Sequence, residues 1–242
     1  YIGSGMGMTA EKLAEQYSSS REEQDEFALL SQKRAAHAQE SGRFAEEIVA
    51  VEVPSRKGTI MVDQDEHIKG EVTQEKLASL KPSFMQNGTV TAGNASGIND
   101  GAASVIIASG EAVEKHELKP LAKIISWGIA GVDPSIMGIG PVPAIKQALA
   151  RAEMTLEEID LIEVNEAFAS QYLAVEKELG LDRDKTNVNG GAIALGHPVG
   201  ASGTRVFLSL AYELKRRGLK YGVASLCIGG GQGIAVIIEN VN

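Results

Sequence analysis

The sequence contains one cysteine, Cys227, and no long apolar run. A single thiol cannot form an internal disulfide, so we predict a reducing compartment and place the protein in the cytoplasm. No stretch reaches the roughly 18 apolar residues that a membrane-spanning helix needs. The first residues also lack the basic start and apolar stretch of a signal peptide. These absences argue against a secreted protein and against a membrane protein.

Basic residues are also in short supply. Lysine and arginine number 23 against 32 aspartates and glutamates, which gives a formal net charge of −9. A protein that binds nucleic acid needs a basic face to neutralise phosphates, and docking on an anionic membrane needs similar charge. We therefore expect neither nucleic acid nor a membrane as a partner.

Signatures of metal and nucleotide binding are missing as well. The 4 histidines are not spaced as metal ligands, and one cysteine cannot build a thiolate zinc site. The glycine runs match neither a P-loop nor a dinucleotide-binding fingerprint. The sequence predicts no metal site and no bound cofactor.

Apolar residues and glycine are abundant. Hydrophobic residues make up 43% of the 242 residues, which is enough for a core in one large or two small domains. The 27 glycines exceed the usual share of about 7%, and several fall in runs that favour sharp turns or close backbone approach. Tyr1 is not a start methionine and residues 1–5 resemble the middle of a loop, so we expect an N-terminal part to be lacking.

Residues 1–98 are polar and rich in charge. Ser20 followed by Glu23 predicts a capping box that opens a helix, and Gly42 is expected to end that helix. The other elements expected in this region are short strands at 48–53 and 59–62 and a short helix at 74–80.

The remaining chain alternates apolar strands with amphipathic helices, which predicts an α/β layered fold in the order β-α-β-α-α-β-β. A β-branched run of small residues at 102–108 is expected to be a buried strand, with a helix behind it at 111–116. The later strands are expected at 121–132, 159–164, 223–227 and 234–239, and the helices at 143–152, 166–179 and 201–217.

Three of these elements end in unusual sequence. Asn165 stands at a strand-to-helix junction, where it would either cap the helix or hold a water. His197 lies in a glycine-rich segment just before a long helix, whose N-terminus favours developing negative charge; the alternative is a structural or surface histidine. Cys227 ends a strand beside the glycines at 229–231, whose backbone N–H groups could form an oxyanion hole; the alternative is a small core residue.

Together these segments resemble the thiolase family in their order and spacing. The matching runs are Asn-Glu-Ala-Phe at 165–168, Gly-His-Pro at 196–198 and Cys-Ile-Gly-Gly-Gly at 227–231. The runs at 6–11, 93–103 and 137–141 agree as well. The resemblance spans essentially the whole chain, so it implies a thiolase-like layered fold.

The resemblance also implies how the chain divides into domains. Residues 1–98 correspond to the α+β loop domain that covers coenzyme A. Residues 99–118 correspond to the last strand and helix of the N-terminal thiolase domain. Residues 119–242 correspond to the C-terminal thiolase domain, of βαβαβαββ type.

In this family a nucleophilic cysteine takes the acyl group, and a second cysteine exchanges a proton with the α-carbon of acetyl-CoA. By resemblance, Cys227 is that second cysteine, and a thiolate of tuned pKa is a workable base near neutral pH. His197 would activate the nucleophile and help to hold the thioester oxygen. Asn165 would position a water in the same oxyanion hole, and Gly229 would donate a backbone N–H to the other oxyanion hole.

The resemblance assigns a further set of residues to substrate binding. Ser96 and Ala92 match residues that line the pantetheine channel, and Ala95 is expected to bind substrate or coenzyme A. Lys69 could meet the phosphates of coenzyme A; the alternative is a solvated surface charge. The residues expected in the walls of the acyl and pantetheine pockets or beside them are Phe84, Met137, Ala167, Phe168 and Met6.

The implied reaction is the reversible condensation of two acetyl-CoA to acetoacetyl-CoA, or thiolysis of a 3-ketoacyl-CoA, with acyl-CoA and coenzyme A as substrates. The family's nucleophilic cysteine lies in its N-terminal domain, and this sequence has no cysteine besides Cys227. We therefore expect the chain to be inactive alone and to need an N-terminal thiolase segment or chain as partner. The alternative is a non-catalytic CoA-binding or assembly subunit of a split thiolase. A homo-oligomer, either a dimer or a tetramer, is also expected.

Overall fold

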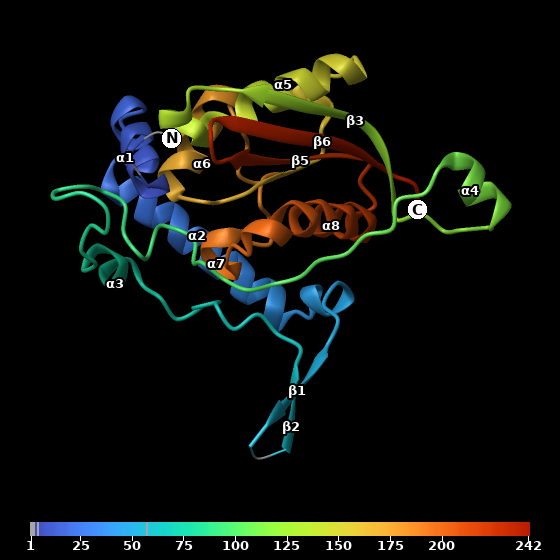
Figure 1. The fold of residues 1–242 in the computed structure, drawn as a ribbon, viewed down its shortest axis with the longest axis horizontal. Helices are drawn as coiled ribbons and strands as arrows, with labels where there is room; N and C mark the ends of the chain where they lie inside the picture. Colours follow the sequence, from blue (N-terminus) through green and yellow to red (C-terminus); the bar gives the residue numbers. More distant parts are fainter. Residues whose placement is uncertain (1–2, 4, 57) are drawn as a thin grey trace.

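The computed structural model describes residues 3, 5–56 and 58–242, and its centre is a four-stranded sheet in the order β3-β6-β5-β4 (Figure 1). The expectation about how the chain begins rests in part on Tyr1, Ile2 and Ser4, which lie outside the described residues. The strands of the sheet are β3 (Ala122–Gly131), β4 (Leu161–Val164), β5 (Tyr221–Ile228) and β6 (Gln232–Asn240).

Strand pairing in this sheet is mixed. β4 and β5 run parallel, whereas β6 is antiparallel to both β5 and β3. The expected order β-α-β-α-α-β-β is confirmed except for one additional short helix, α7 (Ala192–Leu195), between the last two expected helices. The third strand of the βαβαβαββ pattern is not formed as a full strand. In its place, the segment at 185–187 bonds to β4 at one point only, an isolated parallel bridge between Ile162 and Thr186.

Helices cover both faces of the sheet (Figure 1). Along β4, Ile162 and Val164 belong to the cluster shared with α5 and α6, whereas Leu161 packs with α8 on the opposite face. This alternation follows from the two-residue period of a strand. The covering helices are α5 (Pro141–Ala152), α6 (Ala169–Leu179) and α8 (Val199–Arg217).

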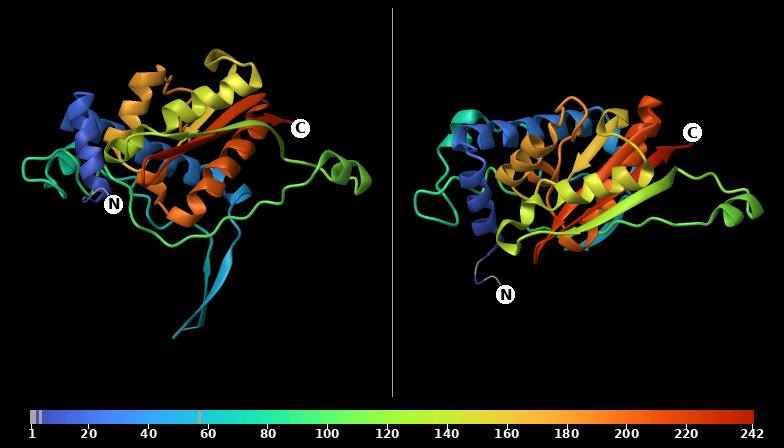
Figure 2. Two further views of the ribbon diagram at one scale, coloured as in Figure 1. Left: turned by 45° about the horizontal axis from the view of Figure 1, so that its top comes forward. Right: turned by 90° about the horizontal axis from the view of Figure 1, so that it is seen from above.

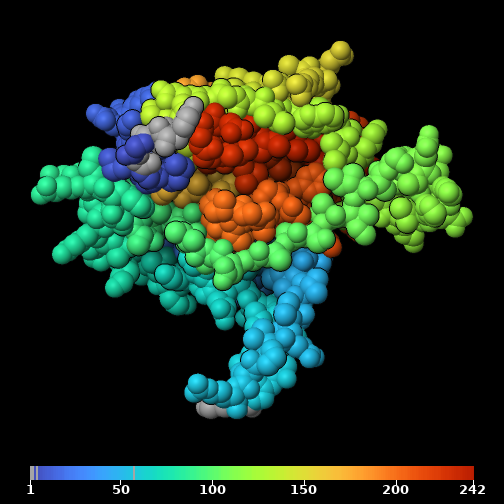
Figure 3. Space-filling model, viewed as in Figure 1, coloured from blue at the N-terminus to red at the C-terminus, as the bar shows by residue number. Residues whose placement is uncertain are grey.

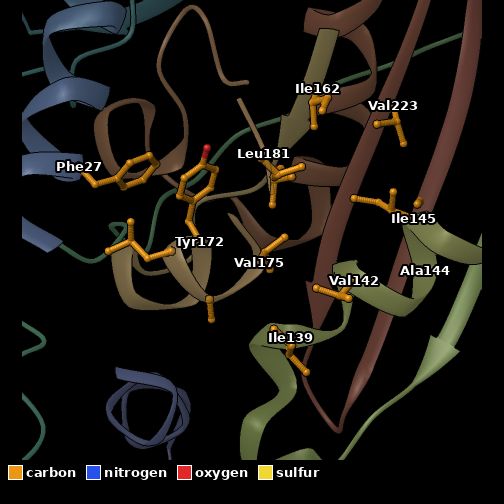
Figure 4. Close-up of a cluster of buried hydrophobic side chains, with 14 of the residues drawn as sticks. Phe27, Ile139, Val142, Ala144, Ile145, Ile162, Tyr172, Val175, Leu181 and Val223 are labelled. Carbon is orange, nitrogen blue, oxygen red and sulfur yellow. The ribbon is translucent and has the colours of Figure 1, made fainter. Parts of the chain in front are cut away.

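The larger core joins the first part of the chain to the sheet. Phe27 of α2 stacks on Tyr172 of α6 with ring centroids 4.0 Å apart, and Ile145 of α5 completes the same cluster (Figure 4). α2 spans Arg21–Glu40 and begins with the predicted capping box, in which Ser20 and Glu23 bond reciprocally. The charge-rich region thus packs on the sheet domain through apolar side chains.

Shorter elements complete the described chain. The helices are α1 (Met6–Gln16), α3 (Gln74–Ala78), α4 (Gly110–Lys115) and α7 (Ala192–Leu195). The 3-10 turns are η1 (Arg43–Glu46), η2 (Pro134–Ile139) and η3 (Leu156–Glu158). None of the described helices is both long enough and apolar enough to cross a bilayer.

A two-stranded hairpin projects from the body (Figures 1 and 2). It consists of β1 (Val51–Ser55) and β2 (Gly58–Val62), and every described position in it is exposed. Val51 pairs with Val62 and Val53 pairs with Ile60, so these four apolar side chains share one face.

The prediction of a buried strand at 102–108 is wrong. This segment is extended but pairs with no described strand, and Ile106 is 95% exposed. It runs over the surface beside α8 and leads to α4, which projects to the side (Figures 2 and 3). A β-branched apolar run becomes a strand only where another strand offers it hydrogen bonds, and none of the described strands lies alongside.

Candidate active site

Asn165 lies directly after β4, at the edge of the sheet where the parallel strands β4 and β5 end. Its backbone N–H donates to the carbonyl of Ser225 (2.9 Å), two residues before Cys227 on β5. Its side chain does not cap α6, because that helix begins at Ala169 with Phe168 at the N-cap. The side chain is buried, and among the described residues Asn165 Oδ1 has no hydrogen-bond partner. An orphaned buried acceptor of this kind suits a bound water.

His197 is held at both its backbone and its ring. Its N–H donates to Asn99 Oδ1 (3.1 Å), which fixes the turn between α7 and α8. Its Nδ1 lies 2.6 Å from Ser202 Oγ, and its Nε2 lies 3.4 Å from Asn165 Nδ2. Because the Ser202 hydroxyl donates to the carbonyl of Pro198 (3.0 Å), Ser202 Oγ accepts from Nδ1–H. This assignment leaves the lone pair on Nε2, so Nε2 is the basic atom of the ring.

Burial lowers the pKa of His197 below its ordinary value of 6.5, and the positive charge of Arg205 lowers it further. The ring is therefore neutral near pH 7. A neutral imidazole with an unprotonated Nε2 can accept a proton there. The imidazolium that results can donate a charged hydrogen bond to an oxyanion.

Cys227 and Gly229 lie where β5 turns into β6. Cys227 pairs with Gly233 across the hairpin, and residues 229–231 form the turn. Gly231 has a φ of 86°, and a Cβ there would lie 2.3 Å from the carbonyl oxygen of Val132, so a side chain at this turn would be both strained and obstructed. Met6 Sδ lies 3.7 Å from where a Cβ on Gly229 would stand, which brings α1 beside this turn.

Burial raises the pKa of the Cys227 thiol to about 12. Among the described residues no charged side chain opposes this effect, so the thiol is protonated near neutral pH. In this state Cys227 is suited to donate a proton. Service as a base would need a further group that stabilises the thiolate.

Five of the expected binding residues contact one another in a single group. Ala95 forms an isolated antiparallel bridge with Phe168, and the Ser96 N–H donates to the carbonyl of Ala167 (3.0 Å). Phe84 meets Phe168 edge to face, with ring centroids 6.1 Å apart. The segment after residue 93 thus lies against the start of α6, next to Asn165.

The other expected binding residues are more scattered. Met137 is buried in η2, and Ala92 is exposed. Lys69 is exposed and contributes a backbone N–H that donates to Gln32 (2.7 Å), while no contact links its ammonium group to the described residues around His197 or Cys227. The structure therefore joins Met6 to the Gly229 turn but leaves Ala92 and Lys69 apart from it.

Sequence reasoning missed the residues that hold the histidine. Asn99 lies in the matching run at 93–103 and Ser202 lies just after the run at 196–198, but no pattern in the sequence assigns them to the backbone or the ring of His197. Arg205, which acts on the same ring, was missed for the same reason. The one available signal was helical spacing, because Ser202 and Arg205 lie in the first two turns of α8.

Within residues 3, 5–56 and 58–242, no group of three or more histidine, cysteine, aspartate or glutamate side chains is arranged to hold a metal ion. The chemistry that the site offers through its own side chains is proton transfer at a neutral imidazole and at a protonated thiol, beside the backbone N–H groups of a glycine turn.

Known proteins share this arrangement of elements. The chain is 58% identical over 235 residues to the human mitochondrial 3-ketoacyl-CoA thiolase, covering 97% of this chain and 59% of that protein. It is 53% identical over 241 residues to acetyl-CoA acetyltransferase of Rhizobium meliloti, covering 100% of this chain and 61% of that protein. The chain thus spans about 60% of the length of the curated relatives that it matches.

Solved structures agree with these relatives. The crystal structure of human mitochondrial 3-ketoacyl-CoA thiolase superposes with a TM-score of 0.95 at 57% identity, over 98% of this chain and 60% of that one. The acetyl-CoA acetyltransferase of Bacillus anthracis superposes with a TM-score of 0.96 at 55% identity, with the same coverage of both chains. The human enzyme has also been solved in complex with CoA, and that structure superposes with a TM-score of 0.91 at 54% identity, over 98% of this chain and 59% of that one.

Two family models match the chain itself. The thiolase N-terminal domain matches residues 1–111, and the thiolase C-terminal domain matches residues 118–240. Together with the relatives and the fold, these matches show that the chain belongs to the thiolase family.

Proposed function

We propose that this chain supplies the proton-transfer half of a thiolase active site that condenses two acetyl-CoA or cleaves a 3-ketoacyl-CoA. The observation that carries the proposal is the Asn165–His197 pair, with Nδ2 and Nε2 3.4 Å apart, built on the loop that is bonded to β5 two residues before Cys227. Relatives with this fold are named as thiolases and acetyl-CoA acetyltransferases, and one has been solved with CoA, which supports CoA thioesters as the substrates.

In the first half-reaction, His197 Nε2 accepts the proton of a nucleophilic thiol as that thiol attacks a thioester carbonyl. The imidazolium that forms carries a new Nε2–H, which can donate to the developing oxyanion and then return its proton to the CoA thiolate that leaves when the C–S bond of the thioester breaks. The buried Asn165 Oδ1, which lacks a partner among the described residues, supports a water bound there that shares this role. Ser202 keeps the ring in the required tautomer throughout.

In the second half-reaction, Cys227 handles the proton of the acetyl α-carbon. In the cleavage direction the thiol donates its proton to the enolate carbon of the leaving acetyl-CoA, and in the condensation direction the thiolate takes it back. The N–H of Gly229 would stabilise the enolate oxygen. The raised pKa of the thiol supports the donating role in the resting protein.

The acyl-accepting nucleophile would come from outside these residues. Cys227 is the only thiol in the 242 residues, and the proposed mechanism already assigns it to proton transfer. We therefore expect the chain to be inactive without a further polypeptide segment that carries the nucleophile.

The decisive experiment uses the protein as purified from its source, with its intact mass determined first. Where a further thiol-bearing segment co-purifies, the wild-type protein should convert acetoacetyl-CoA and coenzyme A to acetyl-CoA. Cys227→Ser should slow hydrogen exchange at the acetyl-CoA methyl group far more than it slows acyl transfer to the nucleophile. Equal losses in both half-reactions would refute the acid/base role of Cys227.

The single thiol also supports a second candidate, a CoA-binding or assembly subunit without catalysis. Incubation with radiolabelled acetyl-CoA separates the two candidates. A protein that binds CoA but forms no covalent thioester, and that co-purifies with no thiol-bearing partner, would favour the binding subunit.

Association with other polypeptides is part of the proposal. The apolar face of the β1–β2 hairpin and the exposed segment 102–108 both leave hydrophobic side chains in water, and two-stranded hairpins are marginally stable alone. We expect the rest of a thiolase, a homo-oligomeric dimer or tetramer, or both, to cover them. Light scattering at several concentrations measures the assembled mass. A cytoplasmic location stays a prediction from the single cysteine.

A further inference from the structure

Glu166 is a buried carboxylate that joins three segments of the chain. It is 1% exposed and follows Asn165 directly. Its Oε2 accepts from the hydroxyl of Ser31 on α2 (2.6 Å) and from the N–H of Ile193 in α7 (3.2 Å). Its Oε1 accepts from Nδ2 of Asn187 (2.9 Å). Burial raises the pKa of this carboxyl, and the three donors oppose that effect.

Asn187 extends this network to the backbone beside Asn165. Its Oδ1 accepts from the N–H of Val164 (2.9 Å), and its Nδ2 also donates to the carbonyl of Val164 (2.8 Å). One side chain therefore bonds both polar groups of the residue that precedes Asn165. The second proton of Nδ2 goes to Glu166, so the carboxylate fixes the rotamer of Asn187.

Ser31 and its neighbour Gln32 extend the network to the segment that carries His197. Ser31 Oγ accepts from the N–H of Gly191 (3.1 Å) while it donates to Glu166. Gln32 Nε2 donates to the carbonyl of Ile193 (3.3 Å), whose N–H is bonded to Glu166. α7 is thus held at both polar groups of Ile193, four residues before His197.

The glycines at 190 and 191 make this contact possible. A Cβ on Gly191 would lie 2.3 Å from the carboxyl carbon of Glu166, and one on Gly190 would lie 2.5 Å from the backbone carbonyl of Ser31. Gly190 also has a φ of 77°, which a side chain would strain. Both positions therefore need glycine so that α2 and the carboxylate can approach the loop before α7.

We infer that Glu166 is a positioning residue that sets the distance between Asn165 and His197, with Ser31 and Asn187 as its partners. The inference rests on the proposed function for its catalytic meaning. The two site residues are on different loops and touch at only one point, Nδ2 to Nε2. The loop that carries Asn165 is tied to Glu166 through Asn187, and the loop that carries His197 is tied to it through Ile193 and Ser31.

The test uses the protein in its purified form with two substitutions, Ser31→Ala and Glu166→Gln. Ser31→Ala removes one donor and one acceptor without changing charge, and Glu166→Gln places amide protons where two donors now point. Both should loosen the segment before His197, so the ring gains water and loses the Asn165 contact. Each of these changes moves the pKa of His197 upward, toward 6.5.

Nuclear magnetic resonance of the imidazole protons measures this pKa in substrate-free protein, with the His197 signal assigned by its loss in His197→Asn. Charged groups near the ring also affect the pKa of His197. Arg205 on α8 acts on His197 directly, and Glu47, Asp65 and Glu163 surround Arg205 from other segments. Removing the charge of Glu166 by itself would lower the pKa of His197, because Arg205 would lose a counter-charge. A raised pKa of His197 in Glu166→Gln therefore indicates a lost positioning contact, whereas a lowered pKa indicates only the lost charge.

The inference predicts a higher His197 pKa in both variants, and a kcat for thiolysis reduced about tenfold to a hundredfold with KM for CoA nearly unchanged. Ser126→Ala is the matched control, because Ser126 also has a buried hydroxyl that donates across elements, to the carbonyl of Ala148 (2.7 Å), away from the site. An unchanged His197 titration in Ser31→Ala, or a lowered pKa in Glu166→Gln, would overturn the inference. The titration of His197 needs no enzyme activity. If the wild-type protein shows no thiolysis, the proposed function is refuted, but the titration still tests whether Glu166 positions His197.

Discussion

Glu163 is a carboxylate in the middle of β4 that should make the stability of the protein depend on pH. It is 4% exposed and alternates with Ile162 and Val164, so it lies on the α8 face of the sheet. Burial raises its pKa from an ordinary 4.5 to about 8. Arg205 opposes this rise, while Glu166, Glu47 and Glu213 add to it.

The sign and the size of the effect follow from these values. Between pH 4.5 and about 8 the folded protein keeps a proton on Glu163 that the unfolded chain has lost. Each pH unit in that window lowers the free energy of unfolding by about 1.4 kcal/mol. The stabilisation by the protonated side chain is thus fully present below pH 4.5, and the loss of stability above pH 8 approaches about 5 kcal/mol.

Glu163→Gln mimics the protonated side chain at every pH. We expect the variant and the wild type to have similar free energies of unfolding in urea near pH 5, and the variant to be several kcal/mol more stable near pH 9. Glu52→Gln, at an exposed position of β1, is the control and should give no such difference. A Glu163→Gln advantage that is the same at both pH values, or that shrinks as pH rises, would refute the reasoning.

Three further predictions concern the core, the turn and the histidine. Phe27→Ala removes the ring stacked on Tyr172 and should destabilise the protein by about 3–5 kcal/mol in urea unfolding, whereas a loss below about 1 kcal/mol would show that the stack contributes little. Gly233→Ala places a Cβ 2.0 Å from the carbonyl oxygen of Gly140 and should lower the melting temperature, while Gly203→Ala, with nothing within 4 Å, should leave it unchanged or raise it; equal melting temperatures would contradict this. Because the pKa of His197 is lowered and the neutral ring is the active form, kcat/KM should fall on acidification only below pH 6.5, and an acidic limb above that value would contradict the assignment.

Most of the fold could be predicted because its signals are local. The capping box at Ser20 and Glu23 predicted the start of α2, and the apolar segments predicted β3, β5 and β6 to within a few residues. Segment 102–108 could not be predicted in the same way. Its composition favours a strand, but a strand exists only if a neighbour completes its hydrogen bonds, and the sequence of one segment does not contain that neighbour.

The sequence motifs of the candidate site could be predicted, but the contacts between its residues could not. Asn165 fitted a helix cap as well as a functional residue, and only the late start of α6 at Ala169 separates the two. The contacts of Glu166 with Ser31 and Asn187 connect residues that are 135 and 21 positions away, and no periodicity reports such pairs. Their signal in the sequence was indirect: the adjacent glycines at 190 and 191 marked a close approach without naming what approaches.

Cys227 illustrates why the sequence left two interpretations of one residue open. A cysteine near the end of an apolar strand can be a small core residue, but Cys227 is only partly buried, and its burial raises the pKa of its thiol to about 12. A thiol that keeps its proton near neutral pH is a poor nucleophile but a ready proton donor, provided that an acceptor of high basicity, such as an enolate carbon, lies beside it. In the proposed function, therefore, the partial burial of Cys227 is what assigns it to proton donation and leaves acyl transfer to another thiol.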